Sequence, residues 1–375
     1  MGRGPVRAAV LTAVGHPLEM RADVEVDDPH PGEVLVRLAA SGVCHTDLSA
    51  RDGRMIMPTP VVLGHEGAGV VEAVGEGVTR VAAGDGVLVS WVPQCGRCYL
   101  CARDQGHLCE RAVVTMATGG LLDGTTRLRS AGAPLHQMAA AGTFAELAVV
   151  PESGVVPLPG DLDLTAASLL GCSVMTGVGA ALNTARIRPG DTVAVVGCGG
   201  VGLNVVQGAR IAGAGEIVAV DTNPAKLRAA AAFGATGAVD ASATDAVSAV
   251  MALTGQRGAD VVFEAVGAAR TIDQAVTMTR RGGQAVLVGI PAMDVTLAVP
   301  AFVGLVLAGK TITGCWYGSA NVHADVPRLV GLYRSGQLLL DELVSRTIAL
   351  DEVDGALDAM AAGGDDARCV VEHRP

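Results

Sequence analysis

The densest group of reactive side chains in this sequence is a set of four cysteines with the spacing C-x2-C-x2-C-x7-C. Its members are Cys95, Cys98, Cys101 and Cys109. Four thiolates carried by short loops are the donor set of a closed, tetrahedral zinc site, which leaves no position open for a substrate. An iron–sulfur cluster and reduced free thiols are the alternatives. We expect a structural zinc ion here that clips a loop and does no chemistry.

A second possible metal set is spread over three separate segments. Cys44, His65 and Cys172 are weak indications taken singly, because a lone cysteine or histidine is often simply packed in a core. Together they supply a thiolate, an imidazole and a thiolate, the Cys2His set of a catalytic zinc with an open fourth position. Asp47 and Glu66 are placed to orient these ligands or to tune the charge of the metal, and we count Glu66 with the metal set.

The third chemical pattern is the glycine-rich run GCGGVG at 197–202, which follows a buried-type strand and opens an amphipathic segment. Gly197 permits a tight turn, Gly199 lets the backbone approach a pyrophosphate, and Gly202 allows close packing of helix on strand. Asp221 lies nineteen residues past Gly202, at the end of the next strand. A carboxylate there binds adenosine ribose hydroxyls and repels a 2′-phosphate, so the pattern predicts NAD rather than NADP. A purely structural glycine-rich turn is the alternative.

Short strands must position the metal ligands of the first half. Runs rich in Val, Leu and Ala are separated there by Gly and Pro turns, a rhythm that predicts a barrel or sandwich. These runs are Val6–Leu11, Glu33–Ala39, Ala68–Val74, Gly86–Trp91 and Phe144–Val150.

From about residue 190, apolar strands alternate with helical patterns, which predicts a doubly wound parallel sheet. The expected strands are Val193–Val196, Ile217–Val220, Val261–Glu264, Ala285–Val288 and Thr311–Cys315. The expected helices are Val201–Ile211, Ala225–Phe233, Ala246–Leu253, Thr271–Thr279 and Phe302–Leu307. After about residue 317 the pattern becomes mixed again and ends in a strand-like Arg368–Val371.

Length and composition exclude several classes of protein. A chain of 375 residues is enough for about two domains, and half of its residues are hydrophobic although only 2% are aromatic. The formal net charge of −11 and the pI near 5.2 argue against non-specific electrostatic binding to nucleic acid or to an anionic membrane. Leu164–Ala185 and Thr192–Ala209 lack charge, but both contain glycines and polar residues that interrupt a membrane-spanning pattern. We expect a cytoplasmic protein without a nucleic-acid or membrane partner.

On these motifs the chain resembles the zinc-dependent medium-chain alcohol dehydrogenases over nearly its whole length. The resemblance rests on GVCHTD at 42–47, GHEGAGVVEAVGEGVTR at 64–80, PQCGRCYLC at 93–101, LLGCSVMTGVGA at 169–180 and VGCGGVGL at 196–203. It implies an α/β protein with a GroES-like β-barrel catalytic domain, formed by residues 1–173 and 317–375. A Rossmann NAD-binding domain at 174–316 would lie between these two segments of the sequence. The resemblance also implies a homodimer or homotetramer.

The resemblance also implies roles for individual residues. Cys44, His65 and Cys172 would bind the catalytic zinc, the four clustered cysteines the structural zinc, and Thr46 would take the alcohol proton. His45 and Arg368 match positions at the cofactor pyrophosphate, Asp221 and Lys226 match ribose contacts, and Thr176 and Val201 match residues beside the nicotinamide. The cofactor-binding candidates are therefore His45, Thr176, Gly197, Gly199, Gly200, Val201, Gly202, Asp221, Lys226 and Arg368.

Within this family the chain is most similar to the class III branch, the glutathione-dependent formaldehyde dehydrogenases. CHTD, PQCG and DGTTR at 123–127 carry that similarity. Val113 stands where that branch has an arginine for the thiol adduct, although Arg111 is close by. Ser49 stands where many relatives place a proton-relaying histidine. Trp91 and Met138 occupy positions of the substrate pocket.

These observations favour reversible oxidation of an alcohol to an aldehyde or ketone, with NAD and two zinc ions per chain. Three alternatives remain open. One is oxidation of a mycothiol or glutathione adduct of formaldehyde, and another is a biosynthetic reductase for a larger carbonyl or C=N substrate. The third is a non-catalytic protein that retains the fold, and the intact zinc ligands, Thr46 and glycine loop count against it.

Overall fold

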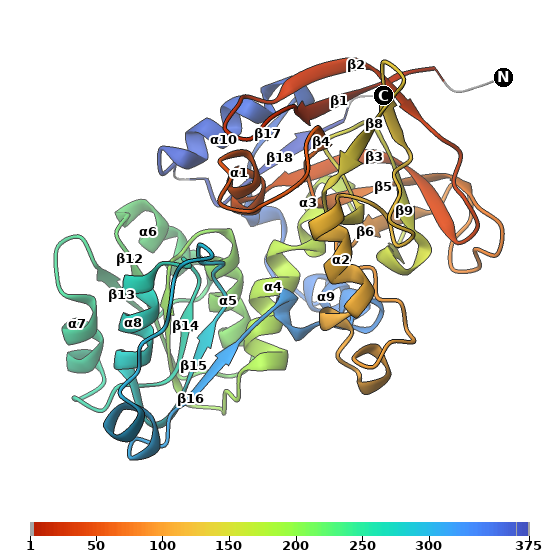
Figure 1. Cartoon of the computed structure of the whole chain (residues 1–375). Helices are drawn as coiled ribbons and strands as arrows, with labels where there is room; N and C mark the ends of the chain where they lie inside the picture. The colour runs from red at the N-terminus through yellow and green to blue at the C-terminus, as the bar shows by residue number, and fades with distance from the viewer. Residues whose placement is uncertain (1–3, 365, 374–375) are drawn as a thin grey trace. The chain divides into compact units, whose positions relative to one another are not determined.

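The computed structural model describes residues 4–364 and 366–373, and its chain divides into two compact units (Figure 1). The first unit combines Met1–Cys172 with Asn321–Val330 and Leu340–Pro375. The second combines Ser173–Ala320 with Gly331–Leu339.

The first unit contains a small closed barrel and a larger sheet of seven strands. The barrel runs in the order β1 (Val6–Leu11), β2 (Glu19–Val26), β7 (Leu128–Ser130), β8 (Ala133–Gln137) and β4 (Val61–Val62). The sheet runs in the order β10 (Val155–Pro157), β6 (Gly86–Val89), β5 (Glu66–Val74), β3 (Glu33–Val43), β18 (Arg368–Glu372) and β17 (Val344–Ile348), and β9 (Leu147–Pro151) also pairs with β3.

The long strand β3 organises this sheet because it pairs with β5, β9 and β18. Two irregularities in its register with β5 bend the strand. Its first half pairs with β9, and its last residues pair with β18. Almost all of its side chains are buried, and Val, Leu and Ala fill the cores on both sides. The apolar runs read from the sequence therefore formed strands because each could bury its side chains against a neighbouring run.

The first unit also contains several short helices. Its α-helices are α1 (His45–Arg51), α2 (Glu110–Thr118), α3 (Leu164–Ser168) and α10 (Val353–Ala361), while α9 (Val322–Arg334) begins in this unit. Its single turns are η1 (Cys101–Arg103), η2 (Gly106–Leu108), η3 (Met138–Ala140), η4 (Glu152–Gly154), η5 (Leu169–Gly171), η9 (Asp341–Leu343) and η10 (Leu350–Glu352).

The second unit is a parallel six-stranded sheet with helices on both sides (Figure 1). Its order is β13 (Gly237–Asp240), β12 (Glu216–Asp221), β11 (Thr192–Val196), β14 (Ala259–Glu264), β15 (Thr279–Leu287) and β16 (Thr311–Gly314). The helical elements are α4 (Ser173–Gly179), η6 (Ala180–Thr184), α5 (Gly200–Ile211), α6 (Pro224–Phe233), α7 (Ala246–Leu253), α8 (Ala269–Met278), η7 (Ala301–Val306) and η8 (Tyr317–Ser319). The predicted doubly wound sheet is confirmed. Its order reverses between β11 and β14, which is where such sheets bind ligands.

Some predicted boundaries need correction. The predicted strand Phe144–Val150 begins only at Leu147, because the Phe144 N–H pairs with Leu63 O across the chain. The predicted helix Phe302–Leu307 is a single wide turn, closed by a bond of 2.7 Å from the Leu307 N–H to Phe302 O. Strand β2 was not predicted, since its largely exposed sequence lacks an apolar run.

Among the described residues, no single helix is both long and apolar enough to cross a membrane. The bent pair Leu164–Gly171 and Ser173–Thr184 passes that test together, by length and composition only.

Candidate active site and cofactor site

The first unit brings the dispersed metal set together. Cys44 follows the end of β3, His65 and Glu66 lie at the start of β5, and Cys172 follows η5. All four are buried, and one donor atom from each lies within 4.8 Å of the others. The fold thus joins side chains that are far apart in the sequence.

Asp47 fixes the orientation of this set. Its carboxylate accepts hydrogen bonds from the N–H of Cys44 at 2.9 Å and of Gly64 at 3.1 Å. It also lies 3.0 Å from Nδ1 of His65. The other ring nitrogen, Nε2, is buried and has no hydrogen-bond partner in the described part of the chain. A carboxylate on one ring nitrogen leaves the other free for a metal, which is the usual arrangement of zinc-binding histidines.

The side chains of this metal set have shifted pKa values. The hydrogen bond from Cys172 lowers the pKa of Cys44 well below its usual value, and the same bond raises the pKa of Cys172. Burial alone would lower the pKa of His65, but Asp47 and Cys44 together raise it well above its usual value. Burial raises the pKa of Glu66 to about 7, although the Arg368 guanidinium opposes this rise. The lowered pKa of Cys44 favours its thiolate, which is the form of cysteine that binds a metal.

Glu66 is held by an ion pair that the sequence did not reveal. Its Oε1 contacts Nη2 of Arg368, and both side chains are buried. The contact is an ion pair without the geometry of a hydrogen bond. A Cβ at Gly42 would collide with Glu66 Oε2 and would lie 3.1 Å from Arg368 Nη2, so a larger residue there would displace the pair. Arg368 thus lies at Glu66, whereas its predicted contact with a cofactor stays a prediction.

The remaining predicted residues of the first unit lie on or near α1 and the metal set. Thr46 Oγ1 lies 3.7 Å from Cys44 Sγ. His45 is exposed at the start of α1, and Ser49 is half-buried on the same helix. The Trp91 ring meets the His65 ring edge to face, with centroids 6.1 Å apart.

Met138 completes the predicted substrate-pocket residues. It is buried in η3, which packs against α2. Trp91 therefore contacts a ligand of the metal set, and Met138 belongs to the surrounding core.

The second metal set is formed by the clustered cysteines. Their four sulfurs lie within 4.8 Å of one another in the loop that follows β6, at Cys95, Cys98, Cys101 and Cys109. All nine cysteines of the chain are free thiols. The Cys101 N–H, 3.4 Å from Cys98 Sγ, lowers the pKa of Cys98 to about 6. The Cys95 N–H donates to Cys109 Sγ at 3.4 Å.

Both donor sets fit zinc. The cysteine cluster supplies four thiols aided by backbone N–H groups, a closed donor set. The other set supplies two thiols and an imidazole. The Nε2 atom of this imidazole is buried without a hydrogen-bond partner among the described residues, which is unfavourable unless a metal binds it. These residues fit a closed structural site and an open catalytic one, respectively.

In the second unit, the glycine turn follows β11 and opens α5. Gly197 has φ +91°, and a Cβ at Gly202 would collide with Gly197 O, so both positions require glycine. A Cβ at Gly199 would meet nothing within 4 Å, which leaves its backbone open to a ligand. Asp221 ends β12 and accepts bonds from the N–H of Cys198 at 2.7 Å and of Asn223 at 2.9 Å. The turn and the carboxylate are thereby fixed to each other.

The other predicted cofactor residues of this unit surround the same turn. Gly200 and Val201 form the first turn of α5, Lys226 lies on α6, and Thr176 lies on α4, which packs against α5. This arrangement has a helix N-terminus and fixed backbone N–H groups, which bind phosphate groups in other proteins.

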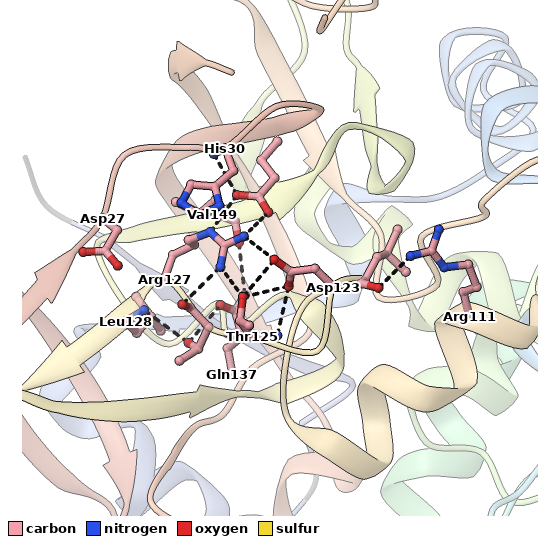
Figure 2. Close-up of polar contacts among 12 residues, drawn as sticks. Asp27, His30, Arg111, Asp123, Thr125, Arg127, Leu128, Gln137 and Val149 are labelled. Atoms are coloured by element: carbon pink, nitrogen blue, oxygen red, sulfur yellow. Dashed lines mark hydrogen bonds and ion pairs between the residues drawn. The ribbon is translucent and has the colours of Figure 1, made fainter. Parts of the chain in front are cut away.

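A third group of potential metal ligands, His30, Glu33 and Asp123, lines a pocket of about 360 Å³ in the first unit. Its two carboxylates share one cation, because Arg127 Nη2 lies 2.6 Å from Glu33 Oε1 and 2.7 Å from Asp123 Oδ2 (Figure 2). Arg127 Nη1 also donates to Thr125 Oγ1 at 2.5 Å. We assign this group a structural role, because Arg127 joins Glu33 of β3 to Asp123 and Thr125.

Comparison with known proteins agrees with this geometry. The family described as "Alcohol dehydrogenase GroES-like domain" matches residues 30–160, and "Zinc-binding dehydrogenase" matches residues 200–335. The chain is 40% identical to "Putative alcohol dehydrogenase D" of Mycobacterium tuberculosis, over 98% of this chain and 99% of that protein. It is 39% identical to "S-(hydroxymethyl)glutathione dehydrogenase" of Escherichia coli, over 95% and 97% respectively. The structure of benzyl alcohol dehydrogenase from Acinetobacter calcoaceticus matches with a TM-score of 0.93 and 31% identity, over 99% of this chain and 100% of that one.

Proposed function

Because the chain belongs to the zinc-dependent alcohol dehydrogenase family, we propose that it catalyses the reversible oxidation of an alcohol to an aldehyde or ketone with NAD. The observation that carries this proposal is the convergence of Cys44, His65 and Cys172, with His65 Nε2 buried and without a partner among the residues described. A buried imidazole held by Asp47 with its other nitrogen unpartnered is what a metal ligand requires, and three protein ligands leave a fourth position for a substrate.

When bound at these ligands, zinc would act as a Lewis acid that makes an alcohol hydroxyl more acidic, and NAD would accept the hydride. The residues of the chain do the rest. Asp47 keeps His65 in the tautomer that presents Nε2. The Thr46 hydroxyl, beside Cys44, accepts the alcohol proton while it passes its own proton on toward water. Arg368 balances the charge of Glu66 behind the ligands. Gly197, in the glycine turn of the second unit, would cradle the cofactor pyrophosphate.

A direct assay tests this function. The purified, zinc-loaded protein is incubated with NAD and a panel of aliphatic and aromatic primary and secondary alcohols, and NADH absorbance is followed. We expect turnover with at least one class of alcohol. Zinc-loaded protein that binds NAD but oxidises no alcohol and reduces no aldehyde would contradict the proposal.

For the substrate we favour an alcohol with a flat, apolar body. The Trp91 ring lies against the metal set, since its edge-to-face contact places it beside His65. The similarity to a benzyl alcohol dehydrogenase supports the same class. In the panel, benzyl-type alcohols should therefore show higher kcat/KM than short aliphatic alcohols.

Oxidation of a thiol adduct of formaldehyde is the second candidate. The 39% identity to S-(hydroxymethyl)glutathione dehydrogenase favours it. Val113 is exposed on α2 where that branch has arginine, and the nearby Arg111 donates to Leu122 O at 2.8 Å. The assay distinguishes the two, because this candidate requires formaldehyde turnover to depend on added glutathione or mycothiol.

We expect a clear preference for NAD over NADP. Asp221 is held by two backbone N–H groups, so its carboxylate cannot easily turn away from an added 2′-phosphate. Replacing Asp221 with asparagine should reduce the ratio of kcat/KM for NAD to that for NADP by about tenfold or more. Steady-state kinetics with both cofactors measure this ratio. Equal efficiency of the wild-type protein with both cofactors would contradict the role given to Asp221.

We further propose a homodimer formed through the second unit. Strand β16 ends the six-stranded sheet, so its outer edge can pair with a second copy. The preceding segment exposes large apolar side chains, including Met293 at 87%, Phe302 at 68% and Val306 at 72%. Such a patch beside an open strand edge is typical of an interface. Together they fit the symmetric contact of two identical chains.

Replacing both Phe302 and Val306 with aspartate should convert the dimer to monomer, because two carboxylates would be buried without partners. Sedimentation velocity of the zinc-loaded protein measures the change. Ile56→Asp is the matched control, since Ile56 is also exposed, at 81%, but lies in the first unit. A dimer that survives the double substitution would refute this interface.

We also infer a cytoplasmic location. The two proposed zinc sites need six of the nine cysteines as thiolates, and a reducing compartment keeps cysteines in that state.

A further inference from the structure

One buried carboxylate of the second unit has no role in the function described so far. Glu264 is the last residue of β14 and is fully buried. In the parallel ladder it lies opposite Val196, the last residue of β11. These two strands are the neighbours at which the sheet order reverses. A sheet of this order binds a dinucleotide in the crevice beyond the carboxyl ends of those strands, so Glu264 lies at the base of that crevice.

The Glu264 side chain fixes the turn that follows β14. Its Oε1 accepts hydrogen bonds from the N–H of Val266 at 3.0 Å and of Gly267 at 2.8 Å. It also accepts a bond of 2.6 Å from the Thr271 hydroxyl on α8. Its Oε2 is buried and has no hydrogen-bond partner within residues 4–364 and 366–373. Burying a carboxylate costs free energy. The three hydrogen bonds to Oε1 offset part of that cost and fix the backbone conformation of the turn.

This turn touches the glycine run that is proposed to hold the cofactor. A Cβ on Gly197 would lie 2.5 Å from Val266 Cγ2, and a Cβ on Gly289 would collide with the Gly267 nitrogen. The Gly289 N–H in turn donates to the backbone oxygen of Glu264 at 2.9 Å. Three loops, after β11, β14 and β15, therefore meet around Glu264 with no space to spare. A shift of the Glu264 turn must therefore move the turn after β15, whose Gly289 meets it backbone to backbone, whereas Gly197 meets chiefly the Val266 side chain.

We propose that Glu264 is a positioning residue for the nicotinamide half of the cofactor site, an inference that rests on the NAD binding proposed above. A sheet of this order consists of two mononucleotide-binding halves. Asp221, at the end of β12, belongs to the half that takes adenosine. Glu264 ends the first strand of the other half. Without its acceptor oxygen, the turn loses its anchor and the second half loses its shape, while the first half stays intact.

Calorimetric titration of the full-length, zinc-loaded protein with NADH and with AMP separates the two halves. Glu264→Leu keeps the volume of the side chain but leaves the Val266 and Gly267 N–H groups without their acceptor. It should raise the Kd for NADH about tenfold or more, with the Kd for AMP within about twofold of the wild-type value. Glu264→Gln keeps one carbonyl acceptor and should raise the NADH Kd by a smaller factor. The Gln variant decides the question if the Leu variant does not fold.

Asp260→Asn is the matched control for a loss of stability alone. Asp260 lies on the same strand, at the opposite end of the sheet, and accepts a bond of 2.8 Å from the Thr192 N–H. Its substitution should lower the melting temperature and leave both Kd values unchanged.

Three results would overturn the proposal: an unchanged NADH Kd in both Glu264 variants, a parallel rise for AMP and NADH, or the same split in Asp260→Asn. Wild-type protein that binds no NADH would instead refute the proposed function, and this inference with it.

Discussion

Replacing Thr46 with valine should lower kcat for alcohol oxidation by about 10²–10⁴-fold, the range expected for loss of a proton-transfer group. Valine keeps the branched shape of threonine but cannot take or pass a proton. Thr46 Oγ1 lies 3.7 Å from Cys44 Sγ, at the metal set and not within it, so the variant should retain its zinc. The measurements are kcat and bound zinc for the purified variant.

Two further variants control this prediction. Thr46→Ser keeps the hydroxyl and should retain much of the activity. Ser49→Ala should cost less than Thr46→Val, because half-buried Ser49 can be replaced by water in a proton path. If Thr46→Val keeps its zinc and near-normal turnover, the proton leaves by another route and the proposed role of Thr46 is wrong.

Elemental analysis of the purified protein should approach two zinc ions per chain, and single substitutions should remove them separately. Cys98→Ser opens the closed four-thiol site, whose metal links a long loop. It should leave about one zinc ion and lower the melting temperature by about 10 °C or more. Cys44→Ser should also leave about one zinc ion, but it should preserve the fold and abolish turnover, because the open site does the chemistry.

Cys315→Ser is the control for loss of a buried thiol without loss of a metal. Cys315 lies in the second unit and belongs to neither metal set. It should keep two zinc ions and nearly all activity. Substantial iron in the wild-type protein, or full activity in Cys44→Ser, would show that the metal assignment is mistaken.

The sequence predicted most of the second unit well because its central strands β11, β12 and β14 are buried on both faces, whereas the edge strand β13, which is only partly buried, was not predicted. The run TVAVV of β11, for example, is wholly buried and apolar after Thr192, and the glycine turn follows at once, so strand, turn and helix can be predicted together. In the first unit the prediction was poorer. Strand β2 is largely exposed, and it exists because β1 and β7 offer it backbone partners. Pairing of that kind leaves no apolar period in the sequence.

The metal set was predictable because thiols and imidazoles have few common uses in combination. The groups behind it were harder to find. Arg368 contacts Glu66 only because β18 pairs with β3. Glu264 was not singled out at all, since one acidic residue at the end of an apolar strand is an ordinary pattern. Its signal was its place beside the reversal of strand order, and that reversal is a property of the fold.

The pairing of β18 with β3 also determines when the surroundings of the metal set, Cys44, His65, Glu66 and Cys172, can be completed during synthesis. Cys44, His65, Glu66 and Cys172 all leave the ribosome before Arg368, the only one of these groups that lies on β18. Until β18 has been made and inserted between β3 and β17, Glu66 lacks its cation and β3 exposes an edge. Contacts between such distant parts of a chain form slowly, because a long loop must close first. The nascent chain therefore carries its metal-binding thiols for most of its synthesis without the strand that encloses them.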